Sequence, residues 1–342
     1  MMKIRKTIAL LTGIGALLLA SCSSDPGAED GGRQVRMPIV LAIPANNAEL
    51  TTGSTGAKAT RAEGDPGTYE KFQLPEYLYI YLINTSIDET ETKVHIPEGM
   101  NLSTGYPLSK DKWTKTTTTD NKKDSIYTYT DQIRIIIPED RKTGVVYAAM
   151  STVPITVNYT GTNVADATFS LGTEAKDKES EALKNLYSSP YNLNNAKGDY
   201  YGTVSDYSSN SPYINMVLYH VASKLDVQWN VDASVQDKVK LSKITLTKLS
   251  GGGKLFKPLE NTASLSTYDE TFTPDEGSQW YGRKATYVIP VKTGSDYLFP
   301  MTLTNSVNNS DKPTTAKATP PATANAFFVP WIYGTVKVTK WP

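Results

Sequence analysis

The chain has 342 residues, and its 35 basic and 35 acidic side chains balance to a formal net charge of zero. A neutral chain without long basic runs offers no surface for nucleic acid, so that class of partner is excluded. Tyrosine occurs 21 times beside many Thr, Val and Ile residues, and 23 Gly and 20 Pro interrupt the chain. This composition predicts a mainly β fold with few short helices, and the length is sufficient for two domains.

Residues 1–21 are predicted to be an export signal. Three basic residues near the start precede an apolar stretch at 8–20, and small residues lead to Cys22. A basic head, a short apolar core and small residues before a cleavage site are typical of secretory signals. The sequence LASC at 19–22 resembles the lipobox of bacterial lipoproteins, which implies that Cys22 is acylated, for example with palmitate. An ordinary signal peptide with a chance cysteine is the alternative.

Residues 22–33 are small, polar and acidic, which predicts a flexible tether. Cys22 is the only cysteine, so disulfides, metal–thiolate sites and a cysteine nucleophile are excluded from the exported part. A first strand is predicted at 35–43. It is followed by a Gly-, Thr-, Ala- and Ser-rich stretch at 46–67, which is predicted to be exposed and accessible to proteases, with Arg61 in its middle.

Further strands are predicted at 76–84, 125–138 and 144–150, with a long hairpin loop at 110–124. Residues 173–187 have helix-forming side chains with an apolar face and predict a helix. A domain boundary is placed near residue 205, between an N-terminal domain at 34–205 and a C-terminal domain at 206–342. Short strands separated by turn residues favour antiparallel β-sandwiches over a βαβ fold.

The second half is predicted to open with one long strand within 213–231, followed by strands at 240–249, 285–291, 297–303 and 326–341. Residues 325–341 follow a polar, proline-containing linker and are strongly apolar. They are a candidate donor strand for a neighbouring subunit, or alternatively the last strand of their own domain. The apolar residues in this segment are Phe327, Phe328, Val329, Trp331, Ile332, Tyr333, Val336, Val338 and Trp341.

No catalytic or metal-binding pattern emerges from the sequence. His95 and His220 are the only histidines, and they lack the spacing of metal ligands. The acidic clusters fall on a predicted loop and a predicted helix face, and the triple glycine at 251–253 lacks the ending of a phosphate-binding loop. We therefore expect no enzyme, no metal and no cofactor.

The stretch at 187–219 is rich in Tyr, Ser and Asn. Aromatic faces beside polar side chains can bind sugars, so Tyr191, Tyr200, Tyr201 and Tyr207 form a candidate ligand surface. Packing between domains is the alternative, and no spacing distinguishes the two.

Cleavage at Arg61 would detach the first strand together with the lipid. The N-terminal domain would then expose a groove with unpaired backbone groups. A strand from a neighbouring subunit could fill this groove, pairing with the exposed backbone and burying alternate side chains. The sequence thus predicts a polymer assembled by strand exchange.

Four segments together resemble the FimA/Mfa-like fimbrillin superfamily of Bacteroidetes, the subunits of type V pili. They are LASC at 19–22, KATRA at 58–62 after the first strand, LYHVASKL at 218–225 and VKVTKW at 336–341. The resemblance implies two tandem transthyretin-like Greek-key β-sandwich domains and lipoprotein export to the outer-membrane surface. It also implies cleavage between Arg61 and Ala62 by an arginine-specific protease, and polymerisation with other fimbrial subunits.

The family contains stalk, tip and anchor subunits. The pair Arg61 and Ala62 and the apolar C-terminus favour a stalk or tip, and tips bind host or bacterial glycans or proteins. A retained lipid would instead indicate an anchor. A surface glycan-binding lipoprotein is the alternative from another class.

Overall fold

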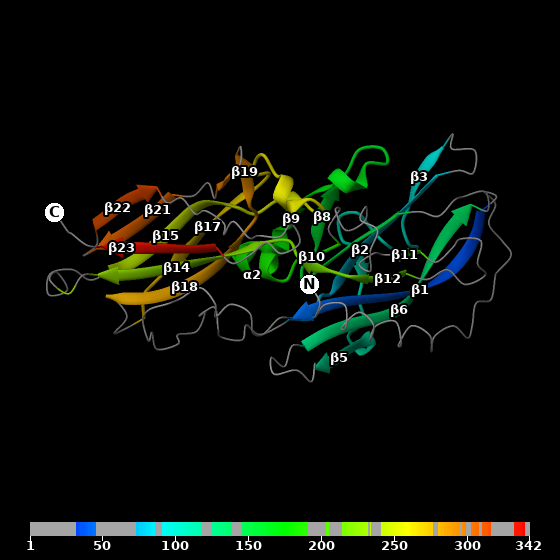
Figure 1. Ribbon diagram of the computed structural model, residues 1–342, viewed down its shortest axis with the longest axis horizontal. Helices are drawn as coiled ribbons and strands as arrows, with labels where there is room; N and C mark the ends of the chain where they lie inside the picture. The colour runs from blue at the N-terminus through cyan, green and yellow to red at the C-terminus, as the bar shows by residue number, and fades with distance from the viewer. Residues whose placement is uncertain are drawn as a thin grey trace.

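The computed structural model describes residues 32–45, 73–85, 91–117, 125–138, 145–189, 203–204, 214–231, 233, 241–275, 280–293, 296–298, 302–307, 310–315 and 332–338. Their fold is mainly β, as the composition predicts (Figure 1). Most strand pairs are antiparallel, as expected for strands separated by short turns.

The first sheet, here called the β1 sheet, has the strand order β11-β12-β1-β6-β5. Its strands are β1 (Gly32–Ala45), β5 (Trp113–Thr117), β6 (Ser125–Pro138), β11 (Thr203–Val204) and β12 (Ile214–Val217). The predicted strands at 35–43 and 125–138 are confirmed. The predicted loop at 110–124 is wrong in part: its Trp and Thr residues suit a pleated edge, and β5 pairs with β6.

A second sheet, the β2 sheet, has the order β13-β10-β7-β2-β3, with β4 also paired to β2. Its strands are β2 (Tyr77–Thr85), β3 (Thr92–His95), β4 (Tyr106–Pro107), β7 (Val145–Ser151), β10 (Tyr187–Ser188) and β13 (Tyr219–His220). Residues 78–82 of β2 are all buried, so both faces of this sheet are covered. One continuous hydrophobic cluster joins it to the β1 sheet.

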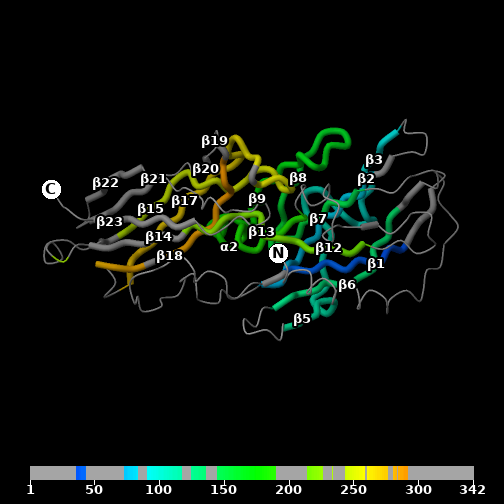
Figure 2. Tube along the Cα trace, viewed as in Figure 1, coloured from blue at the N-terminus to red at the C-terminus, as the bar shows by residue number. Residues whose placement is uncertain are grey.

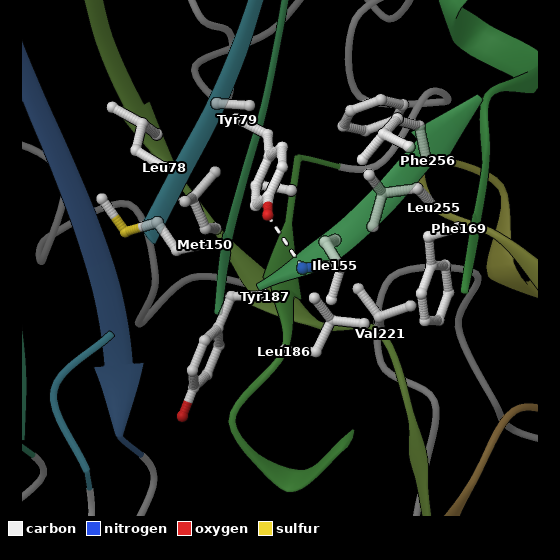
Figure 3. Close-up of a cluster of buried hydrophobic side chains, with 14 of the residues drawn as sticks. Leu78, Tyr79, Met150, Ile155, Phe169, Leu186, Tyr187, Val221, Leu255 and Phe256 are labelled. Atoms are coloured by element: carbon white, nitrogen blue, oxygen red, sulfur yellow. Dashed lines mark hydrogen bonds between the residues drawn. The ribbon is translucent and has the colours of Figure 1, made fainter. Parts of the chain in front are cut away.

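A small third sheet covers the other side of the β2 sheet. It has the order β16-β9-β8, from β8 (Ile155–Asn158), β9 (Thr168–Leu171) and β16 (Gly253–Lys254). The hydroxyl of Tyr79 on β2 accepts a hydrogen bond of 2.8 Å from the backbone N–H of Ile155 on β8. Figure 3 shows Tyr79 pointing to Ile155, away from the side of the sheet where Leu78 and Met150 lie.

The remaining strands form two main sheets, with the orders β18-β14-β23 and β17-β15-β21-β22, and a separate β19–β20 pair. In Figure 1 they occupy the end of the molecule opposite β1 and β3. Their bounds are β14 (Ser223–Val231), β15 (Leu241–Ser250), β17 (Thr267–Phe272), β18 (Tyr281–Val288), β19 (Val291–Thr293), β20 (Asp296–Leu298), β21 (Thr302–Val307), β22 (Ser310–Thr315) and β23 (Ile332–Val338).

The long strand predicted within 213–231 is three strands, each in a different sheet. β12 belongs to the β1 sheet, β13 pairs with β10 in the β2 sheet, and β14 lies between β18 and β23. Apolar alternation continues through the whole run and therefore does not reveal where the chain changes sheets. β12, β13 and β16 all follow residue 205 and pair with earlier strands, so the division at that residue stays a prediction.

Helices are short among the described residues. The predicted helix at 173–187 is only the six-residue α2 (Glu179–Lys184), preceded by the 3-10 turn η4 (Thr173–Ala175) and followed by β10. Asp177 has φ of 62°, which no α-helix accommodates, so the two turns cannot merge. Other 3-10 turns are η2 (Lys110–Lys112), η3 (Val164–Asp166) and η6 (Pro258–Glu260). Within the described ranges, the helices are too short or too polar to cross a membrane.

Candidate functional site: the position of β1

The N-terminal strand β1 occupies an inner position of its sheet rather than an edge. It pairs antiparallel with β6 along all 14 of its residues, from Gly32 opposite Pro138 to Ala45 opposite Ser125. On its other side it pairs parallel with β12, and the N–H of Leu218 extends this ladder with a 2.8 Å hydrogen bond to the carbonyl of Ala42. Removal of β1 would therefore leave unpaired backbone groups on two strands.

From Met37 to Ile43, the side chains of β1 are buried on both faces of the sheet. Met37, Ile39, Leu41 and Ile43 have no exposed surface and belong to the main core. Val40 and Ala42 point to the opposite face, where they pack with Ile126 of β6 in a smaller cluster. Fully burying one large aliphatic side chain contributes about 1.5–3 kcal/mol, so the four core-facing residues together contribute about 6–12 kcal/mol.

β6 is held firmly on the side away from β1. β5 pairs with it over five residues, and the Trp113 ring packs on Tyr129 with ring centroids 5.3 Å apart. Asp131, opposite Ile39 in the register, accepts hydrogen bonds from Lys112 at 2.8 Å and from the Tyr129 hydroxyl at 2.7 Å. Burial opposes ionisation of Asp131, but these hydrogen bonds outweigh it and lower the pKa of its carboxyl.

Among the described residues, the neighbour of β12 away from β1 is the two-residue β11, Thr203 and Val204. The β1 position is therefore flanked by β6, which has β5 on its other side, and by β12, which has β11 on its other side. A replacement strand would have to run antiparallel to β6 and parallel to β12.

The β2 sheet forms the floor of the β1 position. Leu78 and Met150 are directly opposite each other in the β2–β7 register, and both are fully buried. Tyr79 and Tyr81 on the other face of β2 are also buried, and burial raises the pKa of Tyr79 to about 12 and raises that of Tyr81 as well. Both phenols are therefore neutral at physiological pH and place no charge behind the floor of the site.

Most sequence-predicted site residues lie outside the described residues. This applies to Cys22, to Arg61 and Ala62, to Tyr191, Tyr200, Tyr201 and Tyr207, and to Phe327, Phe328, Val329, Trp331 and Trp341. The remaining donor-strand residues, Ile332, Tyr333, Val336 and Val338, belong to β23. β23 pairs parallel with β14, from Leu225 opposite Ile332 to Val231 opposite Val338.

The two histidines lie on separate strands. His220 of β13 packs on Tyr187, with ring centroids 4.6 Å apart, and its Nδ1 is 3.1 Å from the carbonyl oxygen of Lys184. His95 ends β3. Among the residues the structure describes, no three His, Cys, Asp or Glu side chains gather in a way that could hold a metal ion.

Sequence reasoning missed β12 as the second neighbour of β1 and Asp131 as the charged group beside it. Ile214 and Met216 carry the alternation of a strand, but alternation does not identify a pairing partner. Asp131 interrupts an otherwise apolar alternating run, and this interruption was the available signal.

No family model matches the sequence, and no curated protein matches it. Solved structures of adhesion and fimbrial assembly proteins align with most of the chain. A candidate cell adhesion protein of Bacteroides uniformis is 13% identical with a TM-score of 0.39, covering 92% of this chain and 95% of that one. A fimbrial assembly protein of Parabacteroides distasonis is 11% identical with a TM-score of 0.34, covering 90% and 92%. A candidate adhesin of Bacteroides ovatus is 10% identical with a TM-score of 0.41, covering 88% of each chain. These TM-scores lie below 0.5 and do not establish a common fold.

Proposed function

We propose that this protein is a structural subunit of a cell-surface fimbrium, exported as a lipoprotein, cleaved after Arg61 and polymerised by strand exchange. The observation that carries the proposal is the inner position of β1, the first of the described strands. Its departure would expose two strand edges and the apolar floor beneath them, which a strand of another subunit can cover. The segment between β1 and β2 contains Arg61 and the small, polar residues typical of protease-accessible loops.

Strand direction supports a head-to-tail polymer. β1 runs parallel to β12, and β23 runs parallel to β14, which continues from the same run of chain. In Figure 1, β1 and β23 point the same way, and β23 points toward the end of the molecule far from where β1 begins. A strand that leaves one subunit at the β23 end would enter the next subunit with the direction that the β1 position requires.

An empty β1 position would be unfavourable. We therefore expect β1 to be replaced by another strand rather than simply lost. The core-facing residues of β1 contribute about 6–12 kcal/mol by burial alone, and the unpaired edges add to this cost. The apolar C-terminal residues 325–341 are the segment of the sequence best suited to compensate both. Because β23 is an edge strand among the described strands, its release would break one ladder rather than two.

The test uses the chain from Cys22 onward, treated with an arginine-specific protease. The expected result is loss of the residues before Ala62 and a ladder of oligomers on size-exclusion chromatography. Arg61→Lys, which keeps the charge but removes the cleavage site, is the matched control and is expected to stay monomeric. Added peptide of residues 32–45 is expected to suppress the ladder. A cleaved chain that loses β1 and remains monomeric at high concentration contradicts the proposal, whereas a chain isolated uncleaved from cells with Cys22 acylated indicates an anchor.

A further inference from the structure

The triple glycine at 251–253 begins a segment that leaves the β15 sheet and enters the core around the β2 sheet. β16 pairs antiparallel with β9, placing Gly253 opposite Phe169 and Lys254 opposite Thr168. The backbone N–H of Leu255 then donates a 2.9 Å hydrogen bond to the carbonyl of Ala167. In Figure 2 the yellow trace of this segment reaches the green trace near β8 and β9.

Apolar side chains fix this segment in place. Leu255 and Phe256 are buried, and Phe256 packs on Tyr147 and Tyr81 with ring centroids 5.0 and 6.3 Å apart. The Ser188 hydroxyl donates a 2.8 Å hydrogen bond to the carbonyl of Leu255. Figure 3 shows Leu255 and Phe256 in the same cluster as Phe169, Tyr79 and Ile155. Two side chains from the second half of the sequence thus complete the core of the first.

A charged cluster closes the outer side of the segment. Asp166 accepts hydrogen bonds from Lys254 and Lys257, both at 2.9 Å, and from Asn163 at 3.0 Å. The hydrogen bonds from Lys254, Lys257 and Asn163 lower the pKa of Asp166. Two cations from one half of the sequence therefore share one carboxylate from the other half.

The glycines allow this close approach. A Cβ on Gly252 would lie 2.8 Å from the carbonyl oxygen of Phe169, and one on Gly253 would lie 2.5 Å from Oδ1 of Asn261. Any larger residue at either position would push the segment away from β9 or displace the Asn261 side chain, which also accepts a hydrogen bond from the N–H of Lys254. Glycine is therefore required at positions 252 and 253 by close contacts with β9 and Asn261, and not only by the turn.

A second contact lies at α2. The hydroxyl of Ser180 receives hydrogen bonds from the Thr286 hydroxyl at 3.0 Å and from the N–H of Tyr287 at 3.2 Å. Both partners belong to β18, in the same half as the glycine segment. Among the described residues, the glycine segment and α2 thus join the two halves at places other than the connection through β12 to β14, which itself pairs with β1 and β10.

We propose that residues 250–257 are a mechanical clasp that makes the two halves of this subunit one cooperative unit and prevents them from pivoting against each other. The clasp joins the halves by a β ladder, a buried aromatic contact and a shared carboxylate, each of which resists separation in a different way. This inference does not depend on cleavage or polymerisation. In a fibre under tension, such a clasp would carry force between the two ends of the subunit.

The test compares the monomeric full chain with two clasp variants by scanning calorimetry and small-angle X-ray scattering. Wild type is expected to unfold in one transition. Phe256→Ala, and separately the milder pair Lys254→Ala with Lys257→Ala, are expected to split the unfolding into two transitions and to increase the radius of gyration. Ile133→Ala, a buried change in β6 away from the clasp, is the matched control and is expected to lower Tm while keeping one transition.

Two independent transitions in wild type would overturn the inference. It would equally be overturned if both clasp variants kept a single transition with the scattering curve of wild type. Because the lysine pair is partly exposed and removes no core volume, failure of Phe256→Ala to fold would leave the test intact.

Discussion

Truncation of Leu41 should loosen β1 specifically. Leu41 has no exposed surface and lies between Tyr129 of β6 and Met216 of β12 in the two registers. Replacing it with alanine removes three buried carbon atoms, Cγ and the two methyl groups. This leaves a cavity between β6, β12 and the β2 sheet. Leu→Ala changes at such sites cost about 2–5 kcal/mol.

The stability lost in Leu41→Ala should appear mainly as a shift of the equilibrium toward release of β1. Since 1.4 kcal/mol corresponds to a factor of ten, Leu41→Ala should favour release by roughly 30-fold to several thousand-fold. Part of the cavity can close when the neighbouring side chains relax, so the lower end of this range applies if β6 and β12 move together.

The assay uses a chain with a site-specific protease sequence inserted at residue 61 and a fluorophore before β1. After cleavage, unlabelled peptide of residues 32–45 is added in excess, and the loss of fluorescence from the large fragment gives the rate of β1 release. Leu246→Ala, which removes the same atoms from the buried face of β15, is the control. It should lower global stability and leave the release rate close to that of wild type.

The reasoning fails if Leu41→Ala releases β1 at the wild-type rate. It fails equally if Leu246→Ala accelerates release as much as Leu41→Ala does, because the effect would then reflect general loosening rather than the β1 position.

Three further changes test the charged cluster around Asp166 and the packing around Tyr79. The pKa of Asp166 is lowered in the fold, so its contribution to the free energy of unfolding is fully present above its unfolded pKa of about 3.9 and is lost as pH falls through its folded pKa. Tm measured from pH 6 to pH 2 should therefore drop more for wild type than for Asp166→Asn. Tyr79→Phe leaves the buried N–H of Ile155 without its acceptor, so denaturant unfolding should show a loss of about 1–3 kcal/mol. Gly105→Ala combines a positive φ of 67° with a Cβ only 2.9 Å from the Tyr79 ring, so denaturant unfolding should show a loss of more than the roughly 1–2 kcal/mol expected from the left-handed backbone alone.

The strands of this fold could be predicted from sequence where apolar alternation is continuous. The strand at 125–138 has the predicted bounds, and β2 and β7 differ from prediction by a residue at each end. Successive side chains of a strand point to opposite faces, so burial of one face produces an alternating pattern within the strand itself.

The arrangement of those strands could not be predicted in the same way. Nothing in Ile214 or Met216 indicates that they lie beside β1, because pairing partners distant in sequence are selected by the packing of the whole sheet. The same holds for Gly252 and Gly253, whose close approach to β9 and Asn261 exists only after both halves have folded. The existence of β1 could be predicted from the sequence and its release remains a prediction, but its neighbours could not be predicted.

The parallel pairing of Ile39 with Ile214 has a consequence for how the chain folds. Contacts between residues so far apart in sequence carry a large loop-closure entropy and form late, which slows folding. β1 is the first of the described strands to be synthesised, yet its ladder cannot be completed until β12 has followed. Until β12 follows, the sheet exposes apolar surface and the unpaired edge of β1, both of which favour aggregation. A chain of this topology therefore gains little from folding its first strand early, and it keeps its segments apart best when β1 pairs last.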